Sequence, residues 1–118
     1  MDQTNSKHTV QGNQLIIDGS VIPFKFSIAQ VIEVENMLVV RLEVPVKVTY
    51  NENVFGVSIA EKKIKWQIEK WKYNAKMESC PFVGINLVDD QLILSNWCDT
   101  YLVVEPQTGK VLKDGYTK

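Results

Sequence analysis

The sequence predicts an all-β protein, an antiparallel meander of about ten short strands folded as a sandwich or a partly open barrel. Short apolar runs recur along the chain, turn pairs such as Asp18-Gly19 separate them, and several runs alternate between apolar and polar residues. A length of 118 residues fits one domain. We expect a flexible tail over residues 1–13, which are almost entirely polar, and a single β domain over residues 14–118.

The first hairpin is expected at the start of this domain. The runs 14–17 and 20–26 flank Asp18-Gly19, a pair favoured in two-residue turns that need positive φ. Pro23 removes a hydrogen-bond donor from the second run, so this strand should lie at a sheet edge or at a bulge.

A first unit of four strands is expected over about residues 30–70. The runs 30–34 and 37–44 flank the turn pair Glu35-Asn36. The runs 54–59 and 64–70 form the next hairpin, because the second of them alternates cleanly. Residues 60–77 also carry apolar side chains at helical spacing, so an amphipathic helix is the alternative for this stretch.

A long loop and a second unit follow. Residues 71–81 show no steady period and predict the loop. The runs 82–88 and 91–97 flank Asp89-Asp90, and the runs 100–105 and 110–113 flank a turn that begins at Pro106. The second unit therefore covers about residues 84–118.

The two units align with each other. Residues 30–40 align with 84–94 at an offset of 54, and residues 53–57 align with 100–104 at an offset of 47. We interpret this match as an internal repeat, in which the first unit has an insertion near residues 45–50.

Two hairpins carry a resemblance to a known family. The segments 54–66 and 101–113 resemble the outer hairpin of a quinoprotein-type β-propeller blade, in which a turn, a Thr-Gly pair, a Lys and a Trp-ended strand follow one another. The second segment keeps Thr108-Gly109-Lys110 and has Lys113 at the Trp position, whereas the first keeps Trp66. The resemblance implies blade-like hairpins and carries over no cofactor site. The chain is otherwise similar to small bacterial proteins of unassigned function.

Charge and composition exclude several classes of function. The net charge is -1, with 13 basic and 14 acidic residues, which gives no basic field for nucleic acid. The basic and aromatic residues of the 62–76 stretch are interleaved with glutamates, so we interpret this stretch as a solvated face rather than a nucleic-acid site. No apolar run approaches the roughly 20 residues of a membrane span, and the polar N-terminus does not fit a signal peptide. We expect a cytoplasmic protein that binds neither nucleic acid nor membrane.

Residues suited to catalysis or metal binding are few. The single histidine, His8, falls in the expected tail, which is a poor place to hold a base near a nucleophile. Cys80 and Cys98 do not fit a zinc-binding spacing, and we expect reduced structural thiols, with a disulfide or a reactive thiol as the alternatives. Asp89-Asp90 and Asp99 are expected in solvated turns rather than in a metal site. No cofactor is expected.

The favoured function is a non-enzymatic protein–protein interaction or accessory module, of the immunity type or phage-associated, with an unknown protein as partner. Its candidate anchors are Trp71, Tyr73 and Met77 in the long loop, because aromatic residues are frequent at interface hot spots. An open meander also exposes strand edges, so a homodimer through an edge strand or the 71–81 loop is expected.

Two alternatives from other classes remain. One is a small-molecule-binding β-barrel whose cavity would be lined by Phe26, Leu38, Phe55 and Trp97. The other is an enzyme whose site uses carboxylates such as Asp99, or the thiol of Cys98.

Overall fold

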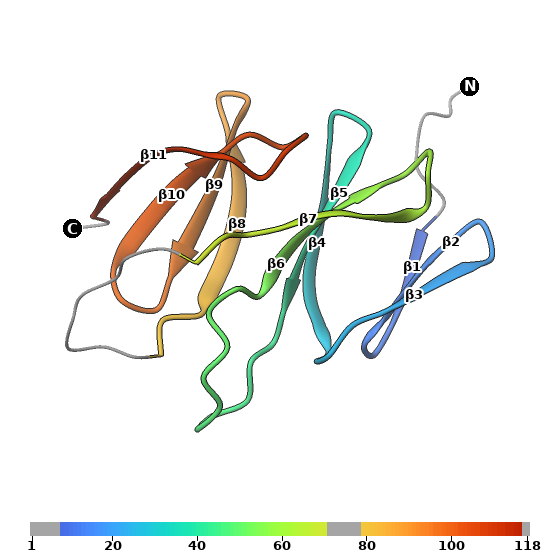
Figure 1. The fold of residues 1–118 in the computed structure, drawn as a ribbon, viewed down its shortest axis with the longest axis horizontal. Helices are drawn as coiled ribbons and strands as arrows, with labels where there is room; N and C mark the ends of the chain where they lie inside the picture. Colours follow the sequence, from blue (N-terminus) through green and yellow to red (C-terminus); the bar gives the residue numbers. More distant parts are fainter. Residues whose placement is uncertain (1–7, 71–78, 117–118) are drawn as a thin grey trace.

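The computed structural model of the protein describes residues 8–70 and 79–116, which form eleven antiparallel strands in three sheets (Figure 1). The strands are β1 (His8–Gln11), β2 (Gln14–Ile17), β3 (Ser20–Pro23), β4 (Ile28–Val34), β5 (Met37–Leu42), β6 (Val54–Ser58), β7 (Lys63–Gln67), β8 (Phe82–Val88), β9 (Gln91–Asn96), β10 (Thr100–Val104) and β11 (Val111–Tyr116). None of these residues is helical. The predicted all-β class is confirmed, with one strand more than the meander that the sequence predicts.

Every sheet is a meander of consecutive strands. We call β1–β3 the N-terminal sheet, β4–β7 the central sheet and β8–β11 the C-terminal sheet. In Figure 1 the C-terminal sheet lies at the left, the central sheet in the middle and the N-terminal sheet at the right. Within the described ranges the strands close no barrel, so the architecture is that of a layered sandwich.

The core has two parts, one on each face of the central sheet. The first lies between the central and C-terminal sheets and includes Val39, Trp66 and Leu94. The second lies between the N-terminal and central sheets and includes Leu15 and Leu38. Because both faces of the central sheet are covered, all five residues of β6 are buried, a pattern typical of a strand between two layers.

The predicted two-residue turns have the expected backbone. Asp18-Gly19 has φ angles of 46° and 86°, Glu35-Asn36 has 50° and 67°, and Asp89-Asp90 has 49° and 65°. Positive φ at both central residues matches the right-handed twist of the flanking strands. These turns therefore fix the hairpins β2–β3, β4–β5 and β8–β9 where the sequence predicts them.

The central and C-terminal sheets share one pairing geometry. Val40 pairs with Phe55 in the central sheet, and the residues at the offsets of 54 and 47, Leu94 and Leu102, pair in the C-terminal sheet. The first hairpin of each sheet has a register shift at the same place, between Ile28 and Gln30 and, 54 residues later, between Phe82 and Gly84. The alignment of the two units thus matches the register of their strands. A duplication as the origin of this similarity stays a prediction.

The second hairpins of the two sheets agree as well. Register shifts separate Gly56 from Val57 and Val103 from Val104, which are 47 residues apart. Gly56 pairs with Trp66, and Val103 pairs with Lys113. Lys113 therefore occupies the position in the C-terminal sheet that Trp66 occupies in the central sheet.

The structure corrects some of the expectations from the sequence and confirms others. Residues His8–Gln11, assigned to the flexible tail, form β1 because their backbone pairs with β2 along the whole strand. Residues 43–53, which contain an alternating run after Pro45, form no strand. Over the described part of 60–77 the chain forms β7, as expected, and the alternative helix is absent from residues 60–70. Pro23 ends β3, an edge strand, as predicted.

Candidate functional site

A short turn between β9 and β10 presents an exposed tryptophan. Asn96 is 5% exposed, and its Oδ1 accepts hydrogen bonds from the backbone N–H groups of Cys98 and Thr100, both at 3.0 Å. Asp99 has a φ of 63°, which closes the turn. The Trp97 side chain is left 66% exposed while its backbone N–H donates to the Pro81 carbonyl at 2.9 Å. The turn is therefore rigid, and its largest side chain lies in solvent.

A disulfide between Cys80 and Cys98 fastens this turn, with 5.5 Å between the two Cα atoms. The expectation of reduced thiols is wrong for this structure. The turn carries Cys98 back over the segment that precedes β8, and this proximity could not be inferred from the spacing of the cysteines. Disulfides persist in oxidising compartments and are rare in the cytoplasm, and the expected cytoplasmic location stays a prediction.

The predicted anchors Trp71, Tyr73 and Met77 lie outside the described residues. The chain next enters the described part at Ser79, whose carbonyl oxygen is 3.8 Å from Cys98 Sγ. The first described residue after the predicted anchors thus lies against the turn that carries Trp97.

The residues proposed to line a ligand cavity do not come together as a set. Leu38 is fully buried and Phe55 nearly so, and Phe26 packs against the same core between the N-terminal and central sheets. Phe55 makes an edge-on contact with Phe24, with 5.0 Å between the ring centroids. Trp97 lies in the turn between β9 and β10 and contributes to neither core cluster. Leu38 and Phe55 are packed core, Phe26 is half-buried at its margin, and no barrel interior is formed by the described strands.

Phe26 does border a surface hollow of about 570 Å³, together with Lys25, Glu43 and the turn at Gly12-Asn13. The Lys25 ammonium lies 5.7 Å from the centre of the Phe26 ring and 5.3 Å from that of Tyr50. Burial raises the pKa of the Tyr50 hydroxyl, which accepts a hydrogen bond from Gln67 Nε2 at 3.1 Å. A cation over two aromatic rings can hold the flat face of a ligand and an anionic group beside it.

The enzymatic alternative loses one of its two candidate groups. Cys98 carries no free thiol, so it offers no nucleophile while the disulfide is intact. Asp99 lies in the Trp97 turn. Across residues 8–70 and 79–116, no three His, Cys, Asp or Glu side chains are grouped so as to hold a metal ion.

Two side-chain amides that the sequence did not single out join the sheets. Gln30 Nε2 donates to the Ile85 carbonyl at 2.7 Å, and Gln30 Oε1 accepts from the Ile85 N–H at 3.0 Å. Arg41 Nε donates to the same Oε1 at 3.1 Å, and burial lowers the pKa of its guanidinium. Asn53 holds Phe82 of β8 in the same manner. Asn53 directly precedes the run 54–59, and nothing in the sequence distinguishes it from its polar neighbours Asn51 and Glu52.

Fold and surface together define a small all-β protein, built from three stacked antiparallel sheets with a disulfide-fastened turn at one end. Residues 5–116 match the family model of a domain of unknown function, DUF7957, and the chain belongs to that family. No curated protein and no solved structure was found to match the chain. The resemblance of its hairpins to propeller blades stays a prediction. No helix among the described residues is long and apolar enough to cross a membrane.

Proposed function

We propose that the protein is a non-enzymatic protein–protein interaction module whose partner docks on the end of the C-terminal sheet that presents Trp97. The observation that supports this proposal best is the 66% exposure of Trp97 on a turn fixed by the Asn96 hydrogen bonds and the disulfide. Tryptophan is the residue most enriched at interface hot spots. Because the backbone of the turn is already fixed, a partner has only the Trp97 side chain to order, which lowers the entropic cost of binding.

Other apolar side chains extend this surface. Tyr116 is 77% exposed and pairs with Thr100, the first residue after the turn. Val83, 47% exposed, lies in the bulge at the same end of the sheet, beside the pair formed by Phe82 and Asn96. We propose Trp71, Tyr73 and Met77 as further anchors, since the chain that follows them returns to the Trp97 turn at Ser79. An accessory role, of the immunity type or phage-associated, would use such a surface.

The disulfide supports a site of action in a non-reducing compartment, whereas a cytoplasmic location would require both cysteines to be reduced. Alkylation of free thiols in rapidly quenched host cells, followed by mass spectrometry, decides between them. Blocked Cys80 and Cys98 would indicate a reducing location, and unmodified cysteines would indicate the disulfide.

The test of the interaction uses the full chain as bait in extracts of its host. A partner identified by mass spectrometry is purified, and its affinity is measured for the wild type, Trp97→Ala and Leu112→Ala. Leu112 is a matched control because it is 59% exposed on the edge strand β11 of the same sheet. We expect Trp97→Ala to weaken binding by about 30-fold or more, and Leu112→Ala by less than about 3-fold. Equal affinity of wild type and Trp97→Ala would contradict the proposed surface.

A second candidate function is the binding of a small anionic ligand in the hollow beside Phe26. The position of Lys25 over the Phe26 and Tyr50 rings favours it. A ligand found in a thermal-shift screen should lose its effect in Phe26→Ala and keep it in Trp97→Ala. A ligand whose effect is the same in both variants binds elsewhere.

A further inference from the structure

Among residues 8–70 and 79–116, no strand packs on the outer face of the C-terminal sheet. Its opposite face packs on the central sheet through Leu92, Leu94, Leu102 and Val104. Because side chains alternate along a strand, the residues between these point away from the core. Six outward-pointing residues of β9, β10 and β11 border a shallow hollow of about 210 Å³: Gln91, Ile93, Ser95, Tyr101, Val103 and Lys113. We call these six residues the outer face.

In the alignment of the two units, the outer face corresponds to the face of the central sheet that the C-terminal sheet covers. The offsets of 54 and 47 place Ile93 on Val39 and Lys113 on Trp66. Val39 and Trp66 lie in the core beneath the C-terminal sheet. The outer face is therefore the surface on which a further sheet would pack, if the stack of sheets continued in the same direction.

The residues of the outer face suit a reversible contact. Ile93 and the nearly buried Val103 form its apolar centre, beside Tyr101. Gln91 stands where the central sheet has Met37, and Lys113 stands where it has Trp66. A face with an apolar centre and a polar rim is typical of interfaces whose partners are also stable apart.

We propose that two copies of this chain associate through their outer faces, about a twofold axis parallel to the strands. A twofold contact needs one surface that is complementary to itself. Asn86, Ile93, Val103 and Lys113 form one row across β8, β9, β10 and β11. Rotation about this axis places β8 of each copy over β11 of the other. Ile93 of one copy then contacts Val103 of the other. Lys113, the one charged residue of the six, then meets the amide of Asn86 instead of a second lysine.

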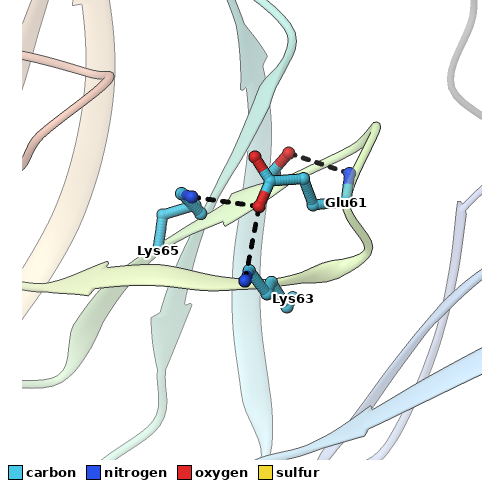
Figure 2. Close-up of polar contacts among 4 residues, drawn as sticks. Glu61, Lys63 and Lys65 are labelled. Atoms are coloured by element: carbon cyan, nitrogen blue, oxygen red, sulfur yellow. Dashed lines mark hydrogen bonds and ion pairs between the residues drawn. The ribbon is translucent and has the colours of Figure 1, made fainter.

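Two strand edges, β7 and β8, fit a second copy less well than the outer face does. Figure 2 shows Glu61 between Lys63 and Lys65, with Lys65 Nζ 3.0 Å and Lys63 Nζ 3.5 Å from Glu61 Oε1. Both lysines belong to β7, the free edge of the central sheet, and lysines on an edge oppose strand pairing. On β8, the edge of the C-terminal sheet, Gln30 and Asn53 already bind the backbone of Ile85 and Phe82.

The outer face is small for a protein–protein interface. Four strands about 4.8 Å apart, with about five residues of about 3.3 Å each, span roughly 300 Å² per copy. This is well below the roughly 800 Å² per partner of a standard stable interface. We therefore expect a weak dimer, with a dissociation constant on the order of 100 μM.

Sedimentation equilibrium from about 10 μM to about 1 mM, a range that brackets this constant, tests the proposal. The average mass of the wild type should rise toward that of two chains. Ile93→Lys, which puts a charge at the centre of the face, should raise the dissociation constant by at least about 10-fold. The control is Val21→Lys, at a 51% exposed valine of the N-terminal sheet, and it should behave as the wild type.

A measurement on the wild type alone tests the proposal even if the Ile93→Lys variant misfolds. Amide chemical shifts of the wild type, followed on dilution, should change in β9 and β10 and remain constant in β1–β3. A wild type that is monomeric at about 1 mM, well above the expected constant, overturns the proposal. So does a folded Ile93→Lys variant that still dimerises, or dilution shifts confined to other strands.

The inference goes beyond the proposed function. Partner binding at Trp97 is measured separately, so the result of either test leaves the other proposal intact.

Discussion

The side-chain amide of Asn53 pairs with the backbone of Phe82 as a neighbouring strand would. Asn53 Nδ2 donates to the Phe82 carbonyl at 2.9 Å, and Asn53 Oδ1 accepts from the Phe82 N–H at 2.8 Å. The same Nδ2 also donates to the Leu42 carbonyl at 2.9 Å. Asn53 is fully buried, so one residue joins the central sheet to the first strand of the C-terminal sheet in a dry environment.

Replacement of Asn53 by alanine should therefore be strongly destabilising. The change leaves the buried N–H and C=O of Phe82 without these partners, and each unsatisfied buried group costs about 1–3 kcal/mol. We expect the free energy of unfolding to fall by about 3 kcal/mol, as measured by urea denaturation. Asn13→Ala is the control, because Asn13 makes one part-buried bond to the Phe24 carbonyl, and about 1 kcal/mol is expected there. Equal losses in the two variants would contradict the role of Asn53.

Gly56 provides room for the Trp66 ring. A Cβ atom at Gly56 would lie 2.1 Å from Trp66 Nε1, and that Nε1 donates to the Pro106 carbonyl at 2.7 Å. Gly56→Ala should displace the ring and break this bond, with a loss of about 3 kcal/mol of stability. Gly84→Ala is a matched control in a strand, since a Cβ there meets nothing within 4 Å, and it should change stability by less than about 0.5 kcal/mol. Thermal melts of the two variants give the comparison.

The predicted features that are confirmed depend on local chemistry. Glu35-Asn36 and Asp89-Asp90 lie between apolar runs, and such a pattern specifies a two-residue hairpin without knowledge of the rest of the chain. The offsets of 54 and 47 could also be derived from the sequence, because they align the alternating apolar residues of the two units. These aligned residues pair in the same register in the two sheets. The strand β1 was missed because three of its four residues are polar and three of the four are exposed.

The features that were missed depend on contacts between distant segments. Which sheet covers which is decided by side chains such as Trp66, which meets Gly56 in its own sheet and Gly109 in the next. The pairing of Cys80 with Cys98 requires the hydrogen bonds by which Asn96 shapes the turn, and the sequence, which predicts a turn at Asp99, does not show these bonds. Trp97 was placed with ligand-lining residues because an apolar side chain in an alternating run is usually buried. Its exposure follows from its place just past the end of β9.

Glu61 should titrate below its ordinary pKa of 4.5. Its hydrogen bond with Lys65 lowers the pKa most, and the charges of Lys65 and Lys63 add to the effect. A carboxyl whose folded pKa is lowered stabilises the fold above its unfolded pKa, and the contribution is lost as pH falls through the folded value. The side chain is exposed, so we expect the effect in its pKa rather than in a large change of stability. Titration by nuclear magnetic resonance should show the pKa rising toward 4.5 in Lys65→Met, and less so in Lys63→Met. A Glu61 pKa that is the same in all three proteins would contradict the ion pair.

The Cys80–Cys98 disulfide closes a loop with a sequence separation of 18 residues. By the loop-closure model, a bond of this span stabilises a fold by about 3 kcal/mol, because it restricts the unfolded chain. The double variant Cys80→Ser, Cys98→Ser should therefore unfold at lower urea concentration than the oxidised wild type. A reducing agent should lower the stability of the wild type to that of the double variant and leave the double variant unchanged. The amide chemical shifts of Cys98 and Asp99, recorded in the same titrations, should report whether the turn loosens before the sheets unfold, as the direct attachment of Cys98 to the turn implies. A wild type whose stability does not respond to the reducing agent, although alkylation shows the thiols to be free, would mean that the packing around Asn96 holds this end of the sheet without the bond.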